Sequence, residues 1–238
     1  NEESYEKLTL FYKVSVALGY TPMAWRQSKV VFIPKMGKGS YDDPKSMRPI
    51  SLTSFMFKGL ERLNHWEALD VHRTTDKMHQ MQFAFCKNKS TEGAISQVVD
   101  KIESGFLMSQ ASIACFLDIS GAYDNILMEP ILKGMKSKQL PYFLIKWYKS
   151  YLENRVASAT IQNHTIVRSL TKGTPQGGVW SSLAWNIAID HILQKYNKPP
   201  FNLVGFADDL CITISGVDCF TMMEMMQPLV DNIVKEYA

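Results

Sequence analysis

A pair of adjacent aspartates between two apolar runs is the feature that most constrains how this chain can fold. Asp208 and Asp209 stand between the run 203–206 and the run 210–214. Each run has the length and composition of a buried strand, so the aspartates are predicted to lie in the turn of a hairpin. Two like charges on one tight turn repel each other, and a divalent cation relieves that repulsion. The alternative is an ordinary turn that uses two aspartates, although neither Asn-Gly nor Asp-Gly is present.

A third aspartate ends another apolar run. Asp118 closes the run 113–118, which is predicted to be a buried strand. The alternative for Asp118 is a helix cap or a simple strand end. Two strands of one sheet that present carboxylates at adjacent ends would form a site for Mg²⁺. Paired magnesium ions about 3.5–4 Å apart serve in-line nucleotidyl transfer, since one lowers the pKa of the attacking hydroxyl and the other holds triphosphate oxygens.

The composition allows a sizeable core and a nucleic-acid partner. The 238 residues are 46% hydrophobic and 21% charged, as in a folded globular protein. The net charge of +3 excludes a polybasic coat. It does not exclude a locally basic groove. The segment 26–48 holds six Lys or Arg and two Asp, and its balance of +4 exceeds that of the whole chain.

Other classes of protein are excluded by what the sequence lacks. The five histidines and four cysteines show no CxxC or HxxxH spacing, which argues against a zinc module. The scattered cysteines indicate reduced thiols in an intracellular protein. No run of about 18 apolar residues occurs, so a membrane span is not expected. The chain begins with Asn1 rather than Met, and we expect it to be cut from a larger polypeptide.

Periodicity predicts most of the regular elements. Helices are predicted over 5–18, 91–105, 127–137, 143–152, 181–195 and 220–237, and strands over 29–34, 113–118, 156–162, 165–170, 203–206 and 210–214. A further helix, capped by Ser51 or Thr53, is expected to bury Phe55 or Met56, Leu60, Leu63 and Trp66. The segments 35–49 and 74–90 are predicted to be loops, and Pro228 is expected to kink or restart the last helix. The irregular mixture of strands and helices favours an α+β fold.

A series of short segments then occurs in an informative order. They are VVFIPK (30–35), GKG (37–39), RPISLT (48–53), QFAF (82–85), STE (90–92), FLDI (116–119), GAYD (121–124), GTPQGG (173–178) and FADD (206–209). Each segment alone is weak evidence for any family, but together the segments cover nearly the whole chain. In this order and spacing they resemble the reverse transcriptase domain of non-LTR (LINE-type, jockey/CR1-like) retrotransposons.

The resemblance implies the fingers and palm of a right-hand polymerase. It assigns 1–110 to the fingers and 111–238 to the palm, with 156–180 contributing partly to the fingers and the nucleotide site. The palm is expected to be an antiparallel sheet backed by helices on one face. The thumb is expected to be absent from this chain, as is a probable endonuclease domain of the parent polyprotein.

The resemblance also assigns roles at the acidic site. Asp118 and Asp208 look like the two catalytic aspartates that bind metal, and the carbonyl of Ile119 would be a further ligand. Asp209 resembles the third, more peripheral catalytic acid. The implied cofactor is a pair of Mg²⁺ ions, for which Mn²⁺ would be a substitute.

Further residues match the family's substrate-binding positions. Tyr123 would be an aromatic gate against the ribose 2′-hydroxyl; the alternative is a half-buried packing aromatic. Gln176 would abut the incoming nucleotide, and Gly177 would let the backbone approach it. The implied triphosphate-binding residues are Lys35, Lys38 and Arg48, and the implied nucleic-acid-binding residues are Lys87, Lys89 and Phe206. For each lysine or arginine the alternative is a solvated loop.

The implied activity is RNA-directed DNA synthesis from a primer 3′-hydroxyl. Its partners would be an RNA template, a DNA primer or target DNA, and dNTPs, in a ribonucleoprotein of the nucleus and cytoplasm, with no membrane. One alternative is an RNA-dependent RNA polymerase, against which Ala207 and Tyr123 argue. Another is an inactive nucleic-acid-binding remnant of a retroelement. The chain departs from the family's pattern at Met36, at 180–183 and at Phe206, but none of these removes a predicted catalytic group.

Overall fold

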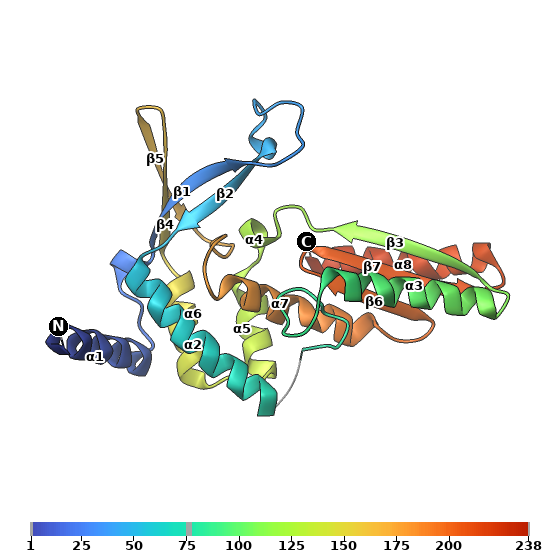
Figure 1. The fold of residues 1–238 in the computed structure, drawn as a ribbon, viewed down its shortest axis with the longest axis horizontal. Coiled ribbons are helices and arrows are strands. Elements are labelled where there is room, and N and C mark those ends of the chain that lie inside the picture. Colours follow the sequence, from blue (N-terminus) through green and yellow to red (C-terminus); the bar gives the residue numbers. More distant parts are fainter. Residues whose placement is uncertain (1, 75–77, 238) are drawn as a thin grey trace. The chain divides into compact units, whose positions relative to one another are not determined.

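The computed structural model describes residues 2–74 and 78–237, which form two compact units (Figure 1). Unit 1 comprises Asn1–Asp76 and Gly121–Trp185, and unit 2 comprises Lys77–Ser120 and Asn186–Ala238. Because each unit is assembled from two separate stretches, the units do not follow a single boundary at 110/111. The assignment of fingers and palm along the chain stays a prediction, since the units are defined by compactness alone.

Unit 1 combines helices with a four-stranded sheet. Its sheet has the order β2-β1-β4-β5, from β1 (Gln27–Pro34), β2 (Met47–Leu52), β4 (Arg155–Ile161) and β5 (His164–Leu170). β1 pairs antiparallel with β2 and parallel with β4. Its helical elements are α1 (Glu2–Leu18), η1 (Met23–Trp25), η2 (Pro44–Ser46), α2 (Phe55–Thr74), α4 (Ala122–Asn125), α5 (Met128–Ser137), α6 (Tyr142–Leu152) and the start of α7 (Ser181–Tyr196).

Strand β2 lies within the segment that was predicted to be a loop, so that prediction was wrong for 47–49. The dipeptide Arg48-Pro49 suggested irregular structure because proline cannot donate to a ladder. Here Pro49 pairs opposite Phe32 on a strand at the edge of the sheet, where one side of the backbone needs no partner. Edge strands tolerate proline for this reason.

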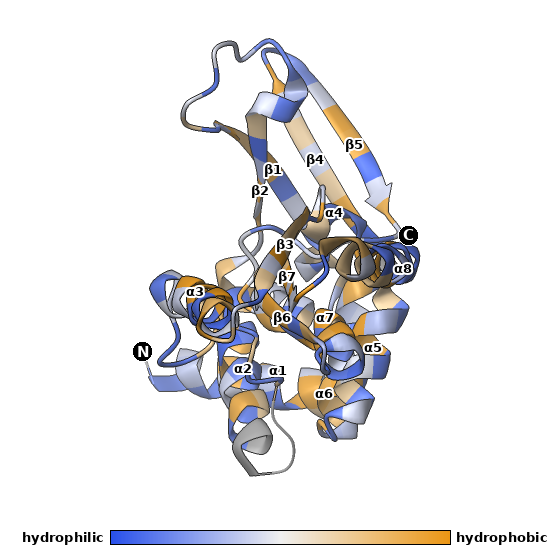
Figure 2. Ribbon diagram, turned by 90° about the vertical axis from the view of Figure 1, so that its right-hand side faces the viewer, coloured by the Kyte–Doolittle hydropathy of each residue, from blue (hydrophilic) through white to orange (hydrophobic). Residues whose placement is uncertain are grey.

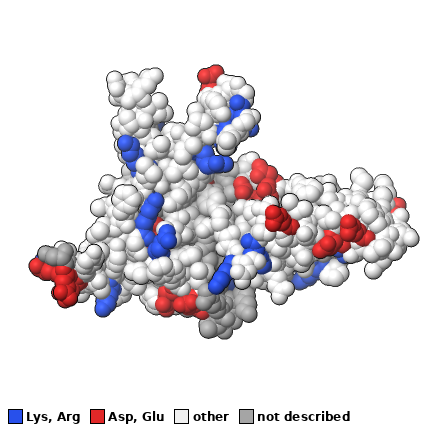
Figure 3. Space-filling model, in the orientation of Figure 1, with Lys and Arg blue, Asp and Glu red and all other residues white. Residues whose placement is uncertain are grey.

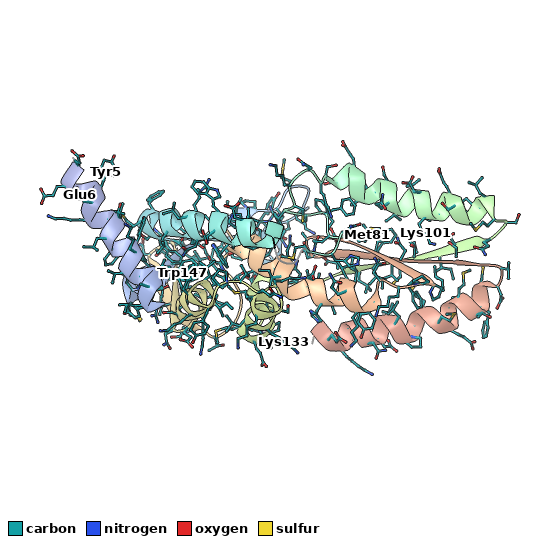
Figure 4. All side chains as sticks on the ribbon, turned by 90° about the horizontal axis from the view of Figure 1, so that it is seen from below. Tyr5, Glu6, Met81, Lys101, Lys133 and Trp147 are labelled. Atoms are coloured by element: carbon teal, nitrogen blue, oxygen red, sulfur yellow. The ribbon has the colours of Figure 1, made fainter. Side chains whose placement is uncertain are left out.

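Aromatic side chains form the core of unit 1. Figure 4 shows Trp147 of α6 packed among the helices, and its ring centroid lies 5.6 Å from that of Trp180. Tyr148 lies 5.0 Å from Trp180, and Phe57 lies 4.3 Å from Tyr151. Large aromatic rings bury the most apolar area per residue, so a few of them suffice to anchor several helices.

Helix α2 buries a different face from the one predicted. Over 55–70, where the side chains are described, its buried residues are Phe57, Leu60, Glu61, Asn64 and Ala68. Of the expected stripe only Leu60 is buried; Phe55 is 91% exposed, and Met56, Leu63 and Trp66 are also exposed. The predicted cap was wrong as well, because Ser51 belongs to β2 and the Thr53 hydroxyl has no hydrogen-bond partner. Apolar residues occur on two sides of this helix, and the aromatic core selects the side that carries Phe57.

Unit 2 is built on an antiparallel sheet of the order β3-β7-β6. The strands are β3 (Ala111–Asp118), β6 (Phe201–Phe206) and β7 (Asp209–Gly216), and the helices are α3 (Thr91–Leu107), α8 (Cys219–Tyr237) and the remainder of α7. β3 and β6 are mainly hydrophobic (Figure 2). All five residues 210–214 of the central strand are buried.

Helices cover both faces of this sheet. Figure 4 shows α3 on one side of the strands and α8 on the other, and both helices contact β3 and β7. The prediction of helices on one face alone was therefore wrong, while that of an antiparallel sheet backed by helices is confirmed. The continuous burial of β7 has the same origin, since a strand covered on both faces need not alternate between buried and exposed residues.

The other predicted helices and strands occur within a few residues of their expected ends, whereas the short helices η1, η2 and α4 were not predicted. Pro228 lies inside α8, which runs as one helix through it, so the helix does not restart there; a kink at Pro228 stays a prediction. Among the described residues, no helix is both long and apolar enough to cross a membrane.

Candidate active site

The pairing register of unit 2 brings three aspartates to one edge of its sheet. β3 ends at Asp118, which pairs opposite Asp209 at the start of β7. Asp209 also pairs opposite Phe206 of β6, so Ala207 and Asp208 form the turn between those strands. The backbone N–H of Ile119 donates to the Asp208 carbonyl at 3.3 Å. The acids predicted to act together are therefore held on three adjoining backbone segments.

The turn that carries Asp208 is under conformational strain. Ala207 has a φ of 55°. This left-handed backbone is uncommon for residues other than glycine, because the Cβ crowds the following carbonyl. The favoured two-residue hairpin turns need a positive φ at their first central residue, which here is Ala207, to match the twist of the strands. The hairpin therefore keeps its tight turn at a local cost in free energy.

The three carboxylates repel one another. The pKa of Asp209 is raised, first by burial and then by the negative charges of Asp208 and Asp118. Figure 3 shows acidic atoms gathered around the end of β3. Such a set of charged oxygens fits a hard divalent cation, which favours carboxylate ligands and would relieve the repulsion. In the described ranges, however, no three Asp, Glu, His or Cys side chains already form a metal-binding group.

An apolar cavity of about 630 Å³ lies beside the acidic edge, between α3 and the sheet. Phe116, Val204 and Phe206 line it together with Ile95, Val99 and Ile102 of α3. Phe206, predicted to bind nucleic acid, is thus half-buried against α3. Its predicted role stays a prediction.

In unit 1, the segment that carries Gln176 is tied to two other elements. Gly173 N–H donates to Ile126 O at 2.7 Å, and Thr174 N–H donates to Tyr123 O at 2.6 Å. On the other side, Ser51 N–H donates to Gln176 O at 2.8 Å. The backbone near Tyr123, the end of β2 and Gln176 are therefore brought together, as expected if they serve one substrate.

Glycine is required at both bends of this segment. Gly173 has a φ of 80°, and a Cβ there would lie 2.7 Å from Asp124 O and 2.8 Å from Tyr123 O. Gly177 has a φ of 106° and would bring a Cβ within 3.2 Å of Ser51 O. Both positions combine a backbone conformation that side chains disfavour with a close approach of another backbone.

The ring of Tyr123 packs on Trp185. Their centroids lie 6.0 Å apart with an interplanar angle of 28°, and Tyr123 is half-buried. This is the packing role that the sequence left as the alternative. The role as a gate stays a prediction, because packing of one ring face does not exclude contact through its edge.

The three cations predicted to bind triphosphate lie on the β1–β2 hairpin and its loop. Lys35 follows β1 and its N–H donates to Ser46 O at 2.9 Å, while Lys38 is exposed in the loop. Arg48 is exposed on β2 opposite Ile33. Figure 3 shows basic atoms along this hairpin. Phosphate binding by these residues stays a prediction.

The two lysines predicted to contact nucleic acid differ in the accessibility of their side chains. Lys89 Nζ donates to Gln82 O at 2.8 Å and to Gln80 O, and it lies 4.9 Å from the centroid of the Phe83 ring. Lys87 is exposed. Lys89 is thus engaged within its own loop, and Lys87 is the more accessible of the two.

Two buried charged residues beside the Gln176 segment were missed. Glu61 of α2 accepts hydrogen bonds from the backbone at Val179 and Trp180, and Arg155 of β4 donates to the carbonyls of Lys172 and Gly173. Glu61 follows Phe57 by four residues and precedes Asn64 by three. A charged residue within the buried stripe of α2 was therefore a signal in the sequence. It could be recognised only if the buried face of α2 had been predicted correctly. Arg155 left no such signal.

Comparisons with known proteins identify relatives of this chain. Residues 33–236 match the family described as reverse transcriptase (RNA-dependent DNA polymerase). A probable RNA-directed DNA polymerase from transposon BS of Drosophila melanogaster is 29% identical over 219 residues, covering 89% of this chain and 24% of the relative. The RNA-directed DNA polymerase from mobile element jockey of the same species is 24% identical over 237 residues, covering 97% and 26%. The chain thus spans about a quarter of these relatives.

The fold also has solved counterparts. An apo telomerase from Candida tropicalis, truncated from its C-terminal domain, superposes with a TM-score of 0.64 at 11% identity, covering 100% of this chain and 53% of the other. A telomerase from the same species in complex with a fragment of telomeric RNA gives a TM-score of 0.63 at 12% identity, covering 98% and 42%. At such identities the similarity shows the fold alone.

Proposed function

This chain belongs to the reverse transcriptase family, and on that premise we propose that it catalyses RNA-directed DNA synthesis within a non-LTR retrotransposon polypeptide. The reaction extends the 3′-hydroxyl of a DNA primer by nucleotidyl transfer from dNTPs. The observation that supports this most strongly is the register that sets Asp118 opposite Asp209 with Asp208 in the adjoining turn. That arrangement gathers hard oxygen ligands at one sheet edge, as nucleotidyl transfer requires.

Divalent metal ions are general to this family. We propose that Asp118 and Asp208 hold two Mg²⁺ ions, that the Ile119 carbonyl is a further ligand, and that Mn²⁺ substitutes. When bound, these ions would make the primer hydroxyl a better nucleophile and neutralise charge on the triphosphate. Asp209 acts more indirectly, through its charge beside the two ligands. The backbone hydrogen bond between Ile119 and Asp208 fixes the two ligand-bearing segments to each other.

The residues of unit 1 bind the substrate in this proposal. Lys35, Lys38 and Arg48 bind the triphosphate, for which cations at the end of a hairpin are suited; Lys38 and Arg48 are exposed, and Lys35 is half-buried. Gln176 and the backbone at Gly177 contact the nucleotide, and the edge of Tyr123 disfavours a ribose 2′-hydroxyl. The support is the set of backbone hydrogen bonds that joins the Gln176 segment to β2 and to Tyr123.

The proposed partners are an RNA template and a DNA primer at the target site. Lys87 is the best placed of the predicted nucleic-acid contacts, because its side chain is exposed. The relatives are about four times longer than the segment that they share with this chain. We propose that a longer parent polypeptide likewise supplies the thumb and an endonuclease.

The test is primer extension on an RNA template by the parent polypeptide. We expect Asp208→Asn to slow extension roughly a hundredfold or more, because a group that acts in the transition state is lost. Asp100→Asn, the same change at an exposed position of α3, is the matched control and should extend normally. Equal rates for Asp208→Asn and the parent would contradict the metal assignment. A parent that binds an RNA–DNA duplex without extending it would favour the inactive remnant instead.

A further inference from the structure

Two buried side chains of opposite charge hold the two ends of the segment 173–180 in unit 1. We propose that Glu61 and Arg155 are positioning residues, which fix the loop that presents Gln176 to the incoming nucleotide. The inference rests on the proposed function, because it assigns these residues to the same nucleotide site. Neither residue touches the reacting atoms in this proposal; both act through the backbone of the loop.

Glu61 holds the end of the loop that leads into α7. Its side chain is 0% exposed, and its carboxylate accepts hydrogen bonds from Val179 N and Trp180 N, both at 3.4 Å. The indole Nε1 of Trp180 also donates to Glu61 O at 2.9 Å. The first turn of α7 contains no acidic residue of its own. Glu61 therefore supplies, from α2, the negative charge that favours the N-terminal end of a helix.

Arg155 holds the other end of the loop. It is 4% exposed, and its Nη2 donates to Lys172 O at 2.9 Å and to Gly173 O. Its Nε donates to Leu152 O at 3.4 Å. A guanidinium can make several hydrogen bonds in a fixed geometry, so one side chain fixes two successive carbonyls. Those carbonyls immediately precede the residues that turn toward Gln176.

Shorter bonds fix the loop between these ends. Ser181 Oγ donates to Pro175 O at 2.7 Å, and Gly178 N–H donates to Pro175 O at 3.0 Å. Ser51 N–H donates to Gln176 O at 2.8 Å. The backbone of Gln176 is thus held directly by β2, while the segments on either side of it are held by Glu61 and Arg155. Loss of either end would free the loop without removing any substrate contact.

Stability alone does not account for this arrangement. Glutamate and arginine are almost never fully buried without partners, because desolvation of a charge is costly. Hydrophobic residues of similar volume often serve a core at least as well. Here the two costly charges direct their hydrogen bonds to opposite ends of one loop, and that loop carries a predicted nucleotide contact. A displacement of a substrate-binding group by even 1 Å is enough to slow an enzyme markedly.

The first experiment compares Glu61→Gln with the parent polypeptide in steady-state primer extension. We expect the KM for dNTP to rise about tenfold, which corresponds to about 1.4 kcal/mol, while binding of the primer–template is unchanged. Glu67→Gln is the matched control, since it makes the same change at an exposed position of the same helix. Arg155→Lys keeps a positive charge but loses the planar guanidinium that donates to two carbonyls. It should therefore raise the KM for dNTP by a similar factor. It provides the test if Glu61→Gln does not fold.

A double-mutant cycle separates positioning from a merely structural role. If Glu61 acts through Gln176, Glu61→Gln should add little to the KM of a Gln176→Ala variant. The same lack of additivity is expected for Arg155→Lys with Gln176→Ala. Additive effects in both cycles would overturn the positioning role, as would an unchanged KM in both single variants. All of these measurements require that the parent polypeptide extends primers. A parent that does not extend them would count against the proposed function and not against the positioning role of Glu61 and Arg155.

Discussion

At the scale of single residues, Glu61 shows how burial and hydrogen bonding oppose each other. Burial raises the pKa of Glu61 to about 7, although the N–H groups of Trp180 and Val179 and the positive charge of Lys58 favour its ionised form. Tyr148 and Tyr151 on α6 and Arg155 on β4 are titratable groups of the same buried cluster, and Tyr123 acts on Tyr148. At neutral pH the buried carboxyl is therefore only partly ionised, and its ionised form is kept at a cost to the fold.

The free energy of unfolding should depend on this carboxyl. Between its ordinary pKa of 4.5 and about 7 the folded chain binds more protons at Glu61 than the unfolded chain. Stability from this group is therefore complete below about pH 4.5 and is lost as the pH rises to about 7, by up to about 3 kcal/mol. Urea unfolding at several pH values measures it, as the difference between the parent and Glu61→Gln. A difference that does not change with pH would show that Glu61 titrates normally.

Ala207 offers a second test at this scale. Its positive φ is disfavoured for alanine, so Ala207→Gly should raise the free energy of unfolding by about 1 kcal/mol. Ala114→Gly in β3 is the matched control. There the backbone is extended, and glycine should lower stability by about 0.5–1 kcal/mol. A gain of stability for Ala207→Gly and a loss for Ala114→Gly in thermal unfolding would support a strained turn. A loss of stability in both variants would argue against strain at Ala207.

At the scale of elements, periodicity predicted the longer helices and most strands, but not β2 and not which face of α2 is buried. Phe55, Met56, Leu63 and Trp66 made a plausible stripe, yet Phe57 packs against the rings of Trp25 and Tyr151. That choice depends on partners far away in the sequence, which periodicity does not contain. The same limit explains why the aspartates at strand ends were predicted while Glu61 and Arg155 were not. A strand end is a local feature, whereas Glu61 and Trp180 lie 119 residues apart.

The buried face of α2 can be tested directly. Phe57→Ala removes a side chain that is 0% exposed, so we expect it to lower the free energy of unfolding by about 3–5 kcal/mol. Phe55→Ala, two residues away and almost fully exposed, should change it by less than about 0.5 kcal/mol. Urea denaturation of both variants decides the matter. A larger loss for Phe55→Ala would restore the stripe that the sequence suggested.

At the scale of the whole molecule, the predicted ligands and the predicted substrate contacts belong to different units. Asp118, Asp208 and Asp209 all lie in unit 2, whereas Lys35, Arg48, Tyr123 and Gln176 lie in unit 1. The predicted metal ligands and these predicted substrate contacts therefore each lie in one compact unit, although each unit is discontinuous in sequence. A simple division at 110/111 does not reproduce this partition.

Hydrogen exchange can separate the two units. Because the acidic edge belongs to unit 2, Mg²⁺ alone should slow amide exchange in the segments around Asp118 and 206–210, and should leave 173–178 of unit 1 unchanged. A ligand that binds only the folded form stabilises it by RT ln(1 + [L]/Kd), which is about 1.4 kcal/mol at a free ligand concentration of ten times Kd. The effect should vanish on chelation and in Asp208→Asn, but persist in Asp100→Asn. Protection that is confined to 173–178 would contradict the assignment of the metal site to unit 2.

The order in which the chain is synthesised gives the pairing of β3 with β7 a further consequence. Asp118 pairs with a residue 91 positions later, and every residue of unit 1 precedes position 186. During translation at about 5–20 residues per second, β3 therefore emerges several seconds before its partner strand exists. Unit 1 can meanwhile be completed on the ribosome, while the strand that bears Asp118 remains without its partner strand. Chaperones that recognise exposed strands should engage the nascent chain during this interval.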